Sequence, residues 1–251
     1  MRRVRASHPS QVVDSAVERG ATLSVRLGAL AWLLAAQFFV AQVAVASAWT
    51  TPFSLKTRFI SDLGNTACGP YPNPSSVIVC SPWHAGMNAS FIIVGITMAA
   101  GAILARSAFK ASWRRSLAVA LFVAAGGGVL MVGVYPENEN ITIHSIGAGI
   151  NFIGGNAALV LFGLTVPSTA SRPRFIWFSI TAGIVGLIST ALFVVRHDLG
   201  LGPGGIERLA AYTTTTWQIV AGLVVLRTRD GRVSRQTSPD ERSLSSTRWA
   251  R

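Results

Sequence analysis

The residues best suited to chemistry lie in the connections between, or at the ends of, six long apolar runs. Ser61 and Asp62 stand in the segment ISDLG, while His84, His144 and Glu207 lie near the starts of three later apolar runs. Carboxyl and imidazole groups act as general acids and bases or bind metals. A serine hydroxyl beside such groups is a candidate nucleophile. These five residues form the candidate catalytic set.

A second group of polar residues is better suited to binding. Asn151 follows His144 after seven residues on the same helix face, roughly 10 Å deeper at 1.5 Å per residue. A guanidinium such as that of Arg196 or Arg208 is suited to hold a phosphate. No metal site and no cofactor is assigned. The candidate binding residues are Asn88, Asn151, Arg196, Arg208 and Gln218.

The apolar runs that carry these residues predict a membrane protein. With 50% hydrophobic and only 13% charged residues, the 251-residue chain is too apolar for an ordinary soluble domain. Six runs without Lys, Arg, Asp or Glu reach the roughly 18–25 residues needed to cross about 30 Å of hydrocarbon as a helix. The predicted fold is all-α, a polytopic bundle of six transmembrane helices over 27–48, 85–105, 117–135, 145–166, 175–195 and 209–226.

Basic residues predict how this bundle is oriented. Of the 22 Lys and Arg residues, 18 fall in the two tails and in the second and fourth connections. Because Lys and Arg resist translocation, both termini of this multi-pass protein are predicted to be cytoplasmic, with the bundle in the cell membrane. The first, third and fifth connections then face outward, together with the candidate residues. The predicted parts are mobile basic tails at 1–26 and 227–251 and a membrane domain at 27–226.

The net charge of +12 does not indicate nucleic-acid binding. Basic residues lie between or outside the apolar runs and form no basic face interleaved with aromatic residues. The predicted partners are therefore membrane lipids and not nucleic acid, and a protein partner remains open.

The two cysteines, Cys68 and Cys80, both lie in the first outward connection, residues 49–84. An outward loop lies in an oxidising compartment, so a disulfide is predicted, folding GPYPNPSSVIV into a compact lid. A pair of metal-binding thiols is the alternative, but the spacing differs from that of Cys-x-x-Cys sites. The clamped segment FISDLGNTACG is expected to cover the mouth of the bundle and to bring Asp62 to His144 and Glu207.

Simpler interpretations remain open beside these predictions. The small-x-small pattern in AVASAWT is also typical of signal-peptide cleavage, which would leave five spans. Asp62 could cap a short interfacial helix, with Gly64 in the left-handed conformation. The histidines could bond backbone carbonyls, the asparagines could join helices, and Glu207 with Arg208 could serve only as helix-start residues.

The ordered segments ISDLGNTAC, HAGMNASF, YPENENITIHSIGAGINFIGGN and GIERLAAYTTTTWQ resemble the bacterial and archaeal membrane family called domain of unknown function 998, over roughly residues 27–227. The resemblance implies a six-helix membrane protein and no particular activity. A more distant similarity to the eukaryotic damage-regulated autophagy modulators, which are similar to GPI-anchor lipid-remodelling proteins, implies lipid handling. It rests on Ser61, Asp62, Gly64, His144, Gly147, Ala148 and Glu207.

Three functions are compatible with these features. The first is an outward-facing polar site directed at lipids, which binds or remodels a headgroup or an acyl ester. The second is a non-enzymatic membrane scaffold or partner subunit. The third is a small-solute transporter, which the lack of an internal repeat and of mid-span charges disfavours. Whether the protein is an enzyme remains open.

Overall fold

The fold is an all-helical bundle with one non-helical connection folded over its end. The computed structural model describes residues 9–49, 52–70, 78–167 and 173–236. Short helical turns are η1 (Leu34–Ala36), η2 (Ser61–Gly64), η3 (Arg106–Ala108) and the π-helical η4 (Ile150–Gly155). The helices are α1 (Pro9–Leu33), α2 (Gln37–Ser47), α3 (His84–Leu104), α4 (Trp113–Val134), α5 (Ile141–Gly149), α6 (Asn156–Thr165), α7 (Pro173–Val194) and α8 (Pro203–Gln236).

Six of the helical segments are long and apolar enough to cross a membrane, which confirms the predicted all-α architecture. They are Thr22–Ser47, His84–Leu104, Trp113–Val134, Ile141–Thr165, Pro173–Val194 and Pro203–Arg227. The largest difference from the sequence prediction is at the sixth segment, which begins six residues early. Pro203 suits the first helical position because its missing N–H has no partner there in any case. Glu207 and Arg208 therefore lie inside α8 and not before it.

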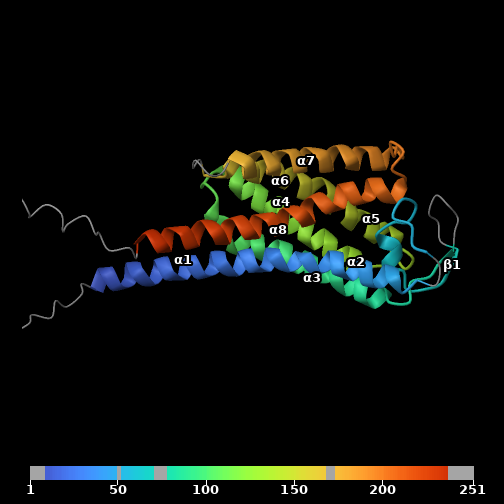
Figure 1. The fold of residues 1–251 in the computed structure, drawn as a ribbon, viewed down its shortest axis with the longest axis horizontal. Coiled ribbons are helices and arrows are strands. Elements are labelled where there is room, and N and C mark those ends of the chain that lie inside the picture. Colours follow the sequence, from blue (N-terminus) through green and yellow to red (C-terminus); the bar gives the residue numbers. More distant parts are fainter. Residues whose placement is uncertain (1–8, 50–51, 71–77, 168–172, 237–251) are drawn as a thin grey trace, which may run out of the picture.

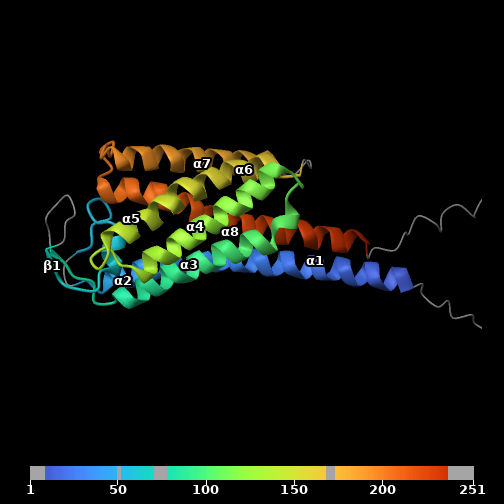
Figure 2. The ribbon, with the colours of Figure 1, turned by 180° about the vertical axis from the view of Figure 1, so that it is seen from behind.

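The ends of the chain extend the bundle at one side. α1 begins at Pro9 and α8 continues to Gln236, so the parts of the predicted tails next to the spans are helical. Residues 1–8 and 237–251, where the rest of the predicted mobile tails lie, are outside the described residues. In Figures 1 and 2, the start of α1 and the end of α8 project from the same end, opposite the connection between α2 and α3.

The helices pack closely where glycines face one another. α3 packs on α4, α4 on α5, and α8 lies between α1 and α7. Gly126 of α4 faces Gly95 of α3, and Gly128 faces Gly147 of α5; a Cβ on any of the four would collide with the partner's backbone. Small residues of this kind allow helix backbones to approach closely in a membrane bundle.

An aromatic cluster fills the half of the bundle nearer the chain ends. Its buried rings are those of Trp32, Phe109, Phe122, Phe162, Phe175 and Trp217. The rings of Trp32 and Trp217 lie 5.2 Å apart in an edge-on arrangement that aromatic pairs favour. The Trp217 indole donates a hydrogen bond to Ser179 Oγ at 2.8 Å, so its buried polar group is satisfied. This half is densely packed and apolar.

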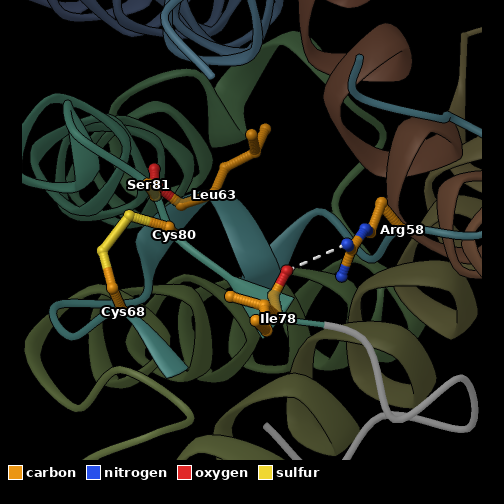
Figure 3. Close-up of a disulfide and its surroundings, with 6 residues drawn as sticks. All are labelled: Arg58, Leu63, Cys68, Ile78, Cys80 and Ser81. Atoms are coloured by element: carbon orange, nitrogen blue, oxygen red, sulfur yellow. Dashed lines mark hydrogen bonds between the residues drawn. A yellow bond between two sulfur atoms is a disulfide. The ribbon is translucent and has the colours of Figure 1, made fainter. Parts of the chain in front are cut away.

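The opposite end, called the mouth here, is covered by the first connection, residues 48–83. This connection contains η2 and two short antiparallel strands, β1 (Gly69–Pro70) and β2 (Ile78–Val79). The predicted disulfide is present and joins Cys68, just before β1, to Cys80, just after β2 (Figure 3). Residues 71–77, most of the predicted lid, lie outside the described residues.

Side chains of the first connection attach the crosslinked strands to the η2 segment. Arg58 Nη2 donates to the Ile78 carbonyl at 3.0 Å, as Figure 3 shows. Ser81 Oγ donates to the Leu63 carbonyl at 2.7 Å, just after Cys80. The disulfide and η2 therefore form one structural unit at the mouth.

We expect loss of the Cys68–Cys80 disulfide to destabilise this unit. Crosslinking a loop of this length removes unfolded-state entropy worth about 3 kcal/mol over a sequence separation of 12 residues. The double variant Cys68→Ser/Cys80→Ser should therefore melt at a lower temperature than the wild type in the same detergent. Reductant should lower the wild-type melting temperature and leave the variant unchanged. Equal melting of the oxidised wild type and the variant would contradict this prediction.

Candidate functional site

A cavity of about 50 Å³ lies in the bundle just beneath the first connection, and is called the mouth cavity here. By volume it has room for about three or four water molecules. Its apolar lining includes Phe38, Phe91, Val94, Met98, Val129, Val132, Ala148, Phe152 and Ala211. The cavity therefore presents a mainly hydrocarbon surface at the end of a membrane-length bundle.

Polar residues from four different elements complete the lining of the mouth cavity. They are Ser61 of η2, His144 of α5, Asn151 of η4, and Glu207, Thr214 and Thr215 of α8. Each of these side chains is almost entirely buried. Four residues predicted from the sequence, namely Ser61, His144, Asn151 and Glu207, thus meet at one place. An apolar cavity with a few convergent polar groups is the usual form of a small-molecule site.

Ser61 belongs to a buried network of two carboxyl groups. Its Oγ donates a hydrogen bond to Glu137 Oε2 at 2.7 Å. Glu137 in turn hydrogen-bonds the Asp62 side chain, which is fully buried and accepts a bond from the Phe59 amide at 3.0 Å. Two carboxyl groups form a hydrogen bond only when one of them carries a proton. This contact next to the candidate nucleophile is therefore favourable only when one of the two carboxyl groups is protonated.

The position of Glu137 favours its protonated form. Burial disfavours the charged carboxylate and is the main reason why the pKa of Glu137 lies well above its usual value of 4.5. The nearby negative charge of Asp62 raises the pKa further, while the bond from Ser61 lowers it. A carboxyl group tuned in this way is a stronger base than an ordinary glutamate once it loses its proton.

His144 is held by a backbone contact that sets its tautomer. Its Nδ1 lies 3.0 Å from the Tyr135 carbonyl oxygen. Because a carbonyl only accepts hydrogen bonds, Nδ1 carries the proton. In the neutral ring Nε2 is then the atom able to accept a proton, an arrangement that suits a general base in the mouth cavity.

Asn151 lies in the cavity wall where the fourth span leaves α-helical geometry. The π-helical turn η4 contains it, and such turns frequently occur at functional sites. Asn156 stabilises this region, donating from Nδ2 to the carbonyls of Phe152 and Ala210. Asn151 Oδ1 is buried and accepts no hydrogen bond from the described residues, so it is available to a group inside the mouth cavity.

Glu207 and Arg208 hold the first connection against α8. Glu207 Oε2 accepts a hydrogen bond from the Ile60 amide at 2.6 Å. Arg208 Nη1 donates to three backbone carbonyls, those of Leu55 at 3.0 Å, Arg58 at 2.6 Å and Gly204 at 2.8 Å. Arg208 Nη1 thus binds the backbone of the first connection, whereas Glu207 both fixes η2 and lines the cavity.

The remaining candidates lie outside the mouth cavity. Asn88 Nδ2 donates to the Gly64 carbonyl at 2.9 Å, and this contact leaves no room for a Cβ on Gly64. Gly64 does not adopt a positive φ, so the alternative interpretation with Gly64 in the left-handed conformation is wrong; the close approach of the Asn88 side chain favours glycine here. His84 is half-buried at the start of α3, and Gln218 is fully buried deeper in α8. Arg196 is exposed at the end of α7.

The structure therefore corrects one expected arrangement and adds one residue. Asp62 does not line the cavity with His144 and Glu207, because its side chain bonds Glu137 and the Phe59 amide. It nevertheless lies close enough to Glu207 for the two carboxyl groups to interact electrostatically. Glu137 is absent from the sequence-based candidate set, although it lies in the third connection on the same side as the others. Among the described residues, no group of three or more His, Cys, Asp or Glu side chains is arranged to hold a metal ion.

Comparison with protein families assigns the chain to a group. A family model described as "Protein of unknown function (DUF998)" matches residues 33–224. The chain belongs to this family. No curated protein and no solved structure matches it. The match to DUF998 confirms the family resemblance seen in the sequence, whereas the similarity to autophagy modulators stays a prediction.

The stability of this DUF998 protein should depend on the proton held by Glu137. Because burial raises its pKa, folded Glu137 keeps its proton at pH values where the unfolded chain has lost it. This contribution to the unfolding free energy is complete below the usual pKa of 4.5 and is lost as pH rises through the folded pKa. Glu137→Gln, which mimics the protonated form, should melt at a higher temperature than the wild type at pH 8.

Melting temperatures of the purified DUF998 protein between pH 4 and 9 test this prediction. Glu139→Gln is the matched control, because Glu139 is an exposed carboxyl in the same connection. The Glu139→Gln profile should follow the wild type, while the Glu137→Gln profile should lose part of its pH dependence. Parallel profiles for Glu137→Gln and the wild type would show that Glu137 does not hold the proton.

Loss of the Arg208 guanidinium should loosen the first connection of this DUF998 protein. Arg208→Met keeps an unbranched apolar stem but leaves the carbonyls of Leu55 and Arg58 without this donor. Each buried carbonyl left unpaired costs about 1–3 kcal/mol. The expected result is a lower melting temperature and faster proteolysis within residues 48–83. The control Arg106→Met changes an exposed residue in η3 and should alter neither; equal effects of both variants would refute the role of Arg208.

Proposed function

We propose that this protein binds or remodels a membrane lipid at the mouth cavity. The observation that carries the proposal is the composition of the cavity, in which Ser61, His144, Asn151 and Glu207 complete a lining that is otherwise hydrocarbon. A lipid combines the same two properties, a polar ester or headgroup and an apolar chain. Six membrane-length helices support this function, because they would keep the protein in the bilayer where such a ligand is found.

In this proposal, the Ser61–Glu137 pair carries out the reaction. When Glu137 has lost its proton, it is placed to accept the Ser61 hydroxyl proton over the 2.7 Å contact. Ser61 Oγ would then form a bond to the carbonyl carbon of an acyl ester. The alcohol part of the lipid would leave with the proton from Glu137, and water or another alcohol would later take the acyl group from Ser61. The raised pKa of Glu137, caused mainly by burial, makes its carboxylate a stronger base than an ordinary glutamate and so supports this proton exchange.

The packing of the bundle favours a closed pocket rather than a pore. The mouth cavity lies on one side of the aromatic cluster, and the rings of Trp32, Phe122 and Trp217 fill the bundle beyond it. A transport pathway would need this cluster to open, whereas lipid binding at the mouth does not. The volume of about 50 Å³ admits only a small part of a lipid, so we expect η2 to move when the ligand enters.

One specific observation favours a second candidate, a scaffold or partner subunit. Asp62, Asn88 and Arg208 all bond the backbone of the first connection, as residues with a purely structural role would. In a scaffold, Ser61 and His144 would also serve only packing. The two functions therefore differ in what the cavity residues do, and not in what the residues of the connection do.

Substitution of Ser61 separates these two functions. Cells that produce the wild-type protein should differ in lipid composition from cells that lack it, and Ser61→Ala should abolish that difference because the nucleophile is removed. The measurement is a lipid profile by mass spectrometry at equal amounts of folded protein. Ser116→Ala, an exposed serine in α4, is the matched control and should behave as the wild type. A wild-type lipid profile with Ser61→Ala would contradict remodelling and favour the scaffold.

A further inference from the structure

A second, larger hollow lies between the end of α7 and the start of α8 and is called the α7–α8 groove here. Its volume is about 420 Å³, within the roughly 300–1,000 Å³ range of small-molecule sites. Its lining residues are Phe59, Phe193, Val194, Arg196, Asp198, Pro203 and Ile206. The groove is distinct from the mouth cavity, with which it shares no lining residue.

The groove carries one positive and one negative group that do not pair with each other. Arg196 is exposed, and no described residue forms an ion pair or hydrogen bond with its guanidinium. Asp198 Oδ1 accepts a hydrogen bond from the Gly200 amide at 2.9 Å, which leaves its second oxygen for another donor. Two opposite charges therefore lie along one hollow, two residues apart.

The backbone at Arg196 holds this charge in an unusual conformation. α7 ends with the amide of His197 donating to the Leu192 carbonyl at 2.9 Å, a pattern in which the preceding residue is left-handed. Arg196 occupies that position with φ 56°, where glycine is usual because other residues are strained. The chain thus accepts a conformational cost at the residue that lines the groove with a guanidinium.

The surroundings of the groove match the level of lipid headgroups. Val194 ends the fifth membrane-length segment and Pro203 begins the sixth, so the groove lies where apolar helices meet polar connections. Large apolar side chains next to it are exposed, with 72% of Val194 and 63% of Leu199 accessible. Exposed apolar surface beside charged groups at this depth suits an amphiphile, whose chain covers the former and whose headgroup meets the latter.

We propose that the α7–α8 groove binds an aminophospholipid, a membrane lipid whose headgroup contains one phosphate and one ammonium group. The Arg196 guanidinium binds the phosphate, for which its planar donors are suited. Asp198 binds the ammonium group, and an acyl chain lies along Val194 and Phe193. An anionic lipid without an amine offers the Asp198 carboxylate neutral hydroxyl donors but no opposite charge.

The groove also adjoins the mouth cavity through aromatic contacts. The Phe193 ring lies 5.8 Å from Phe59 in the groove and 6.1 Å from Phe152, which lines the cavity. Ile206 of the groove directly precedes Glu207 of the cavity. Binding in the groove stands on its own contacts, whereas the further step, that this lipid is the one on which the cavity acts, rests on the proposed function.

Lipid binding to the full-length detergent-solubilised protein tests the groove directly. Native mass spectrometry with dioleoyl phosphatidylethanolamine and dioleoyl phosphatidylglycerol gives the apparent Kd of each lipid. The wild type should bind phosphatidylethanolamine about tenfold more tightly, the effect of one charge-assisted hydrogen bond. Arg196→Ala should weaken binding of both lipids by about tenfold, and Asp198→Lys should reverse the preference towards phosphatidylglycerol. Arg106→Ala, at an exposed site in η3, should bind as the wild type.

Two outcomes would overturn the groove proposal. One is equal affinity of the wild type for the two lipids, and the other is wild-type binding by both Arg196→Ala and Asp198→Lys. Ser61→Ala separates this proposal from the proposed function, because it should bind lipid in the groove as the wild type does. If the groove variants lose binding while cells that produce Ser61→Ala keep the wild-type lipid profile, the groove stands and remodelling at the mouth cavity fails.

Discussion

The structure depends on how the backbone of the first connection is satisfied where it is buried against the bundle. Buried amides and carbonyls of a non-helical segment need partners from the protein itself, because water cannot reach them there. Glu207 and Arg208, adjacent on α8, supply opposite types of partner. The carboxylate accepts from the Ile60 amide, and the guanidinium donates to the Leu55 and Arg58 carbonyls. These hydrogen bonds of Glu207 and Arg208 with the backbone hold η2, and with it Ser61, over the mouth cavity.

The same constraint explains why so much acidic chemistry gathers at the mouth. Asp62 stabilises the turn into η2 through the Phe59 amide and is thereby fully buried. Burial, and after it the negative charge of Asp62, raise the pKa of Glu137 well above its usual value, and Glu137 bonds both Asp62 and Ser61. The fold and the candidate chemistry therefore share the same side chains. A group that stabilises the connection also sets the basicity available to the nucleophile.

The sequence was sufficient to predict the long helices and the disulfide, but not which distant side chains contact one another. Uninterrupted apolar runs predict six long helices, and two cysteines in one connection predict the disulfide. Periodicity says nothing about contacts between distant connections, so the bond from Ser61 to Glu137, 76 residues away, could not be predicted. The periodicity of the sequence also gave no sign that the fourth span leaves α-helical geometry in η4, the turn that contains Asn151. Arg196 and Arg208 looked equivalent in the sequence, yet Arg196 lines an open groove, while Arg208 is buried and donates from Nη1 to backbone carbonyls.

The two halves of the bundle differ in how their side chains are packed. At the end where the chain termini project, Trp32, Phe162 and Trp217 pack edge to face or stacked, with their indole groups satisfied. Dense packing of this kind resists rearrangement. At the mouth, Asn151 Oδ1 is buried without a described partner. The connection is held there by hydrogen bonds with Glu207 and Arg208, and its residues Ile60 and Leu63 are buried in a second apolar cluster. Because the mouth cavity lies beneath η2, a ligand is expected to enter by displacing η2 against these contacts while the aromatic half stays fixed.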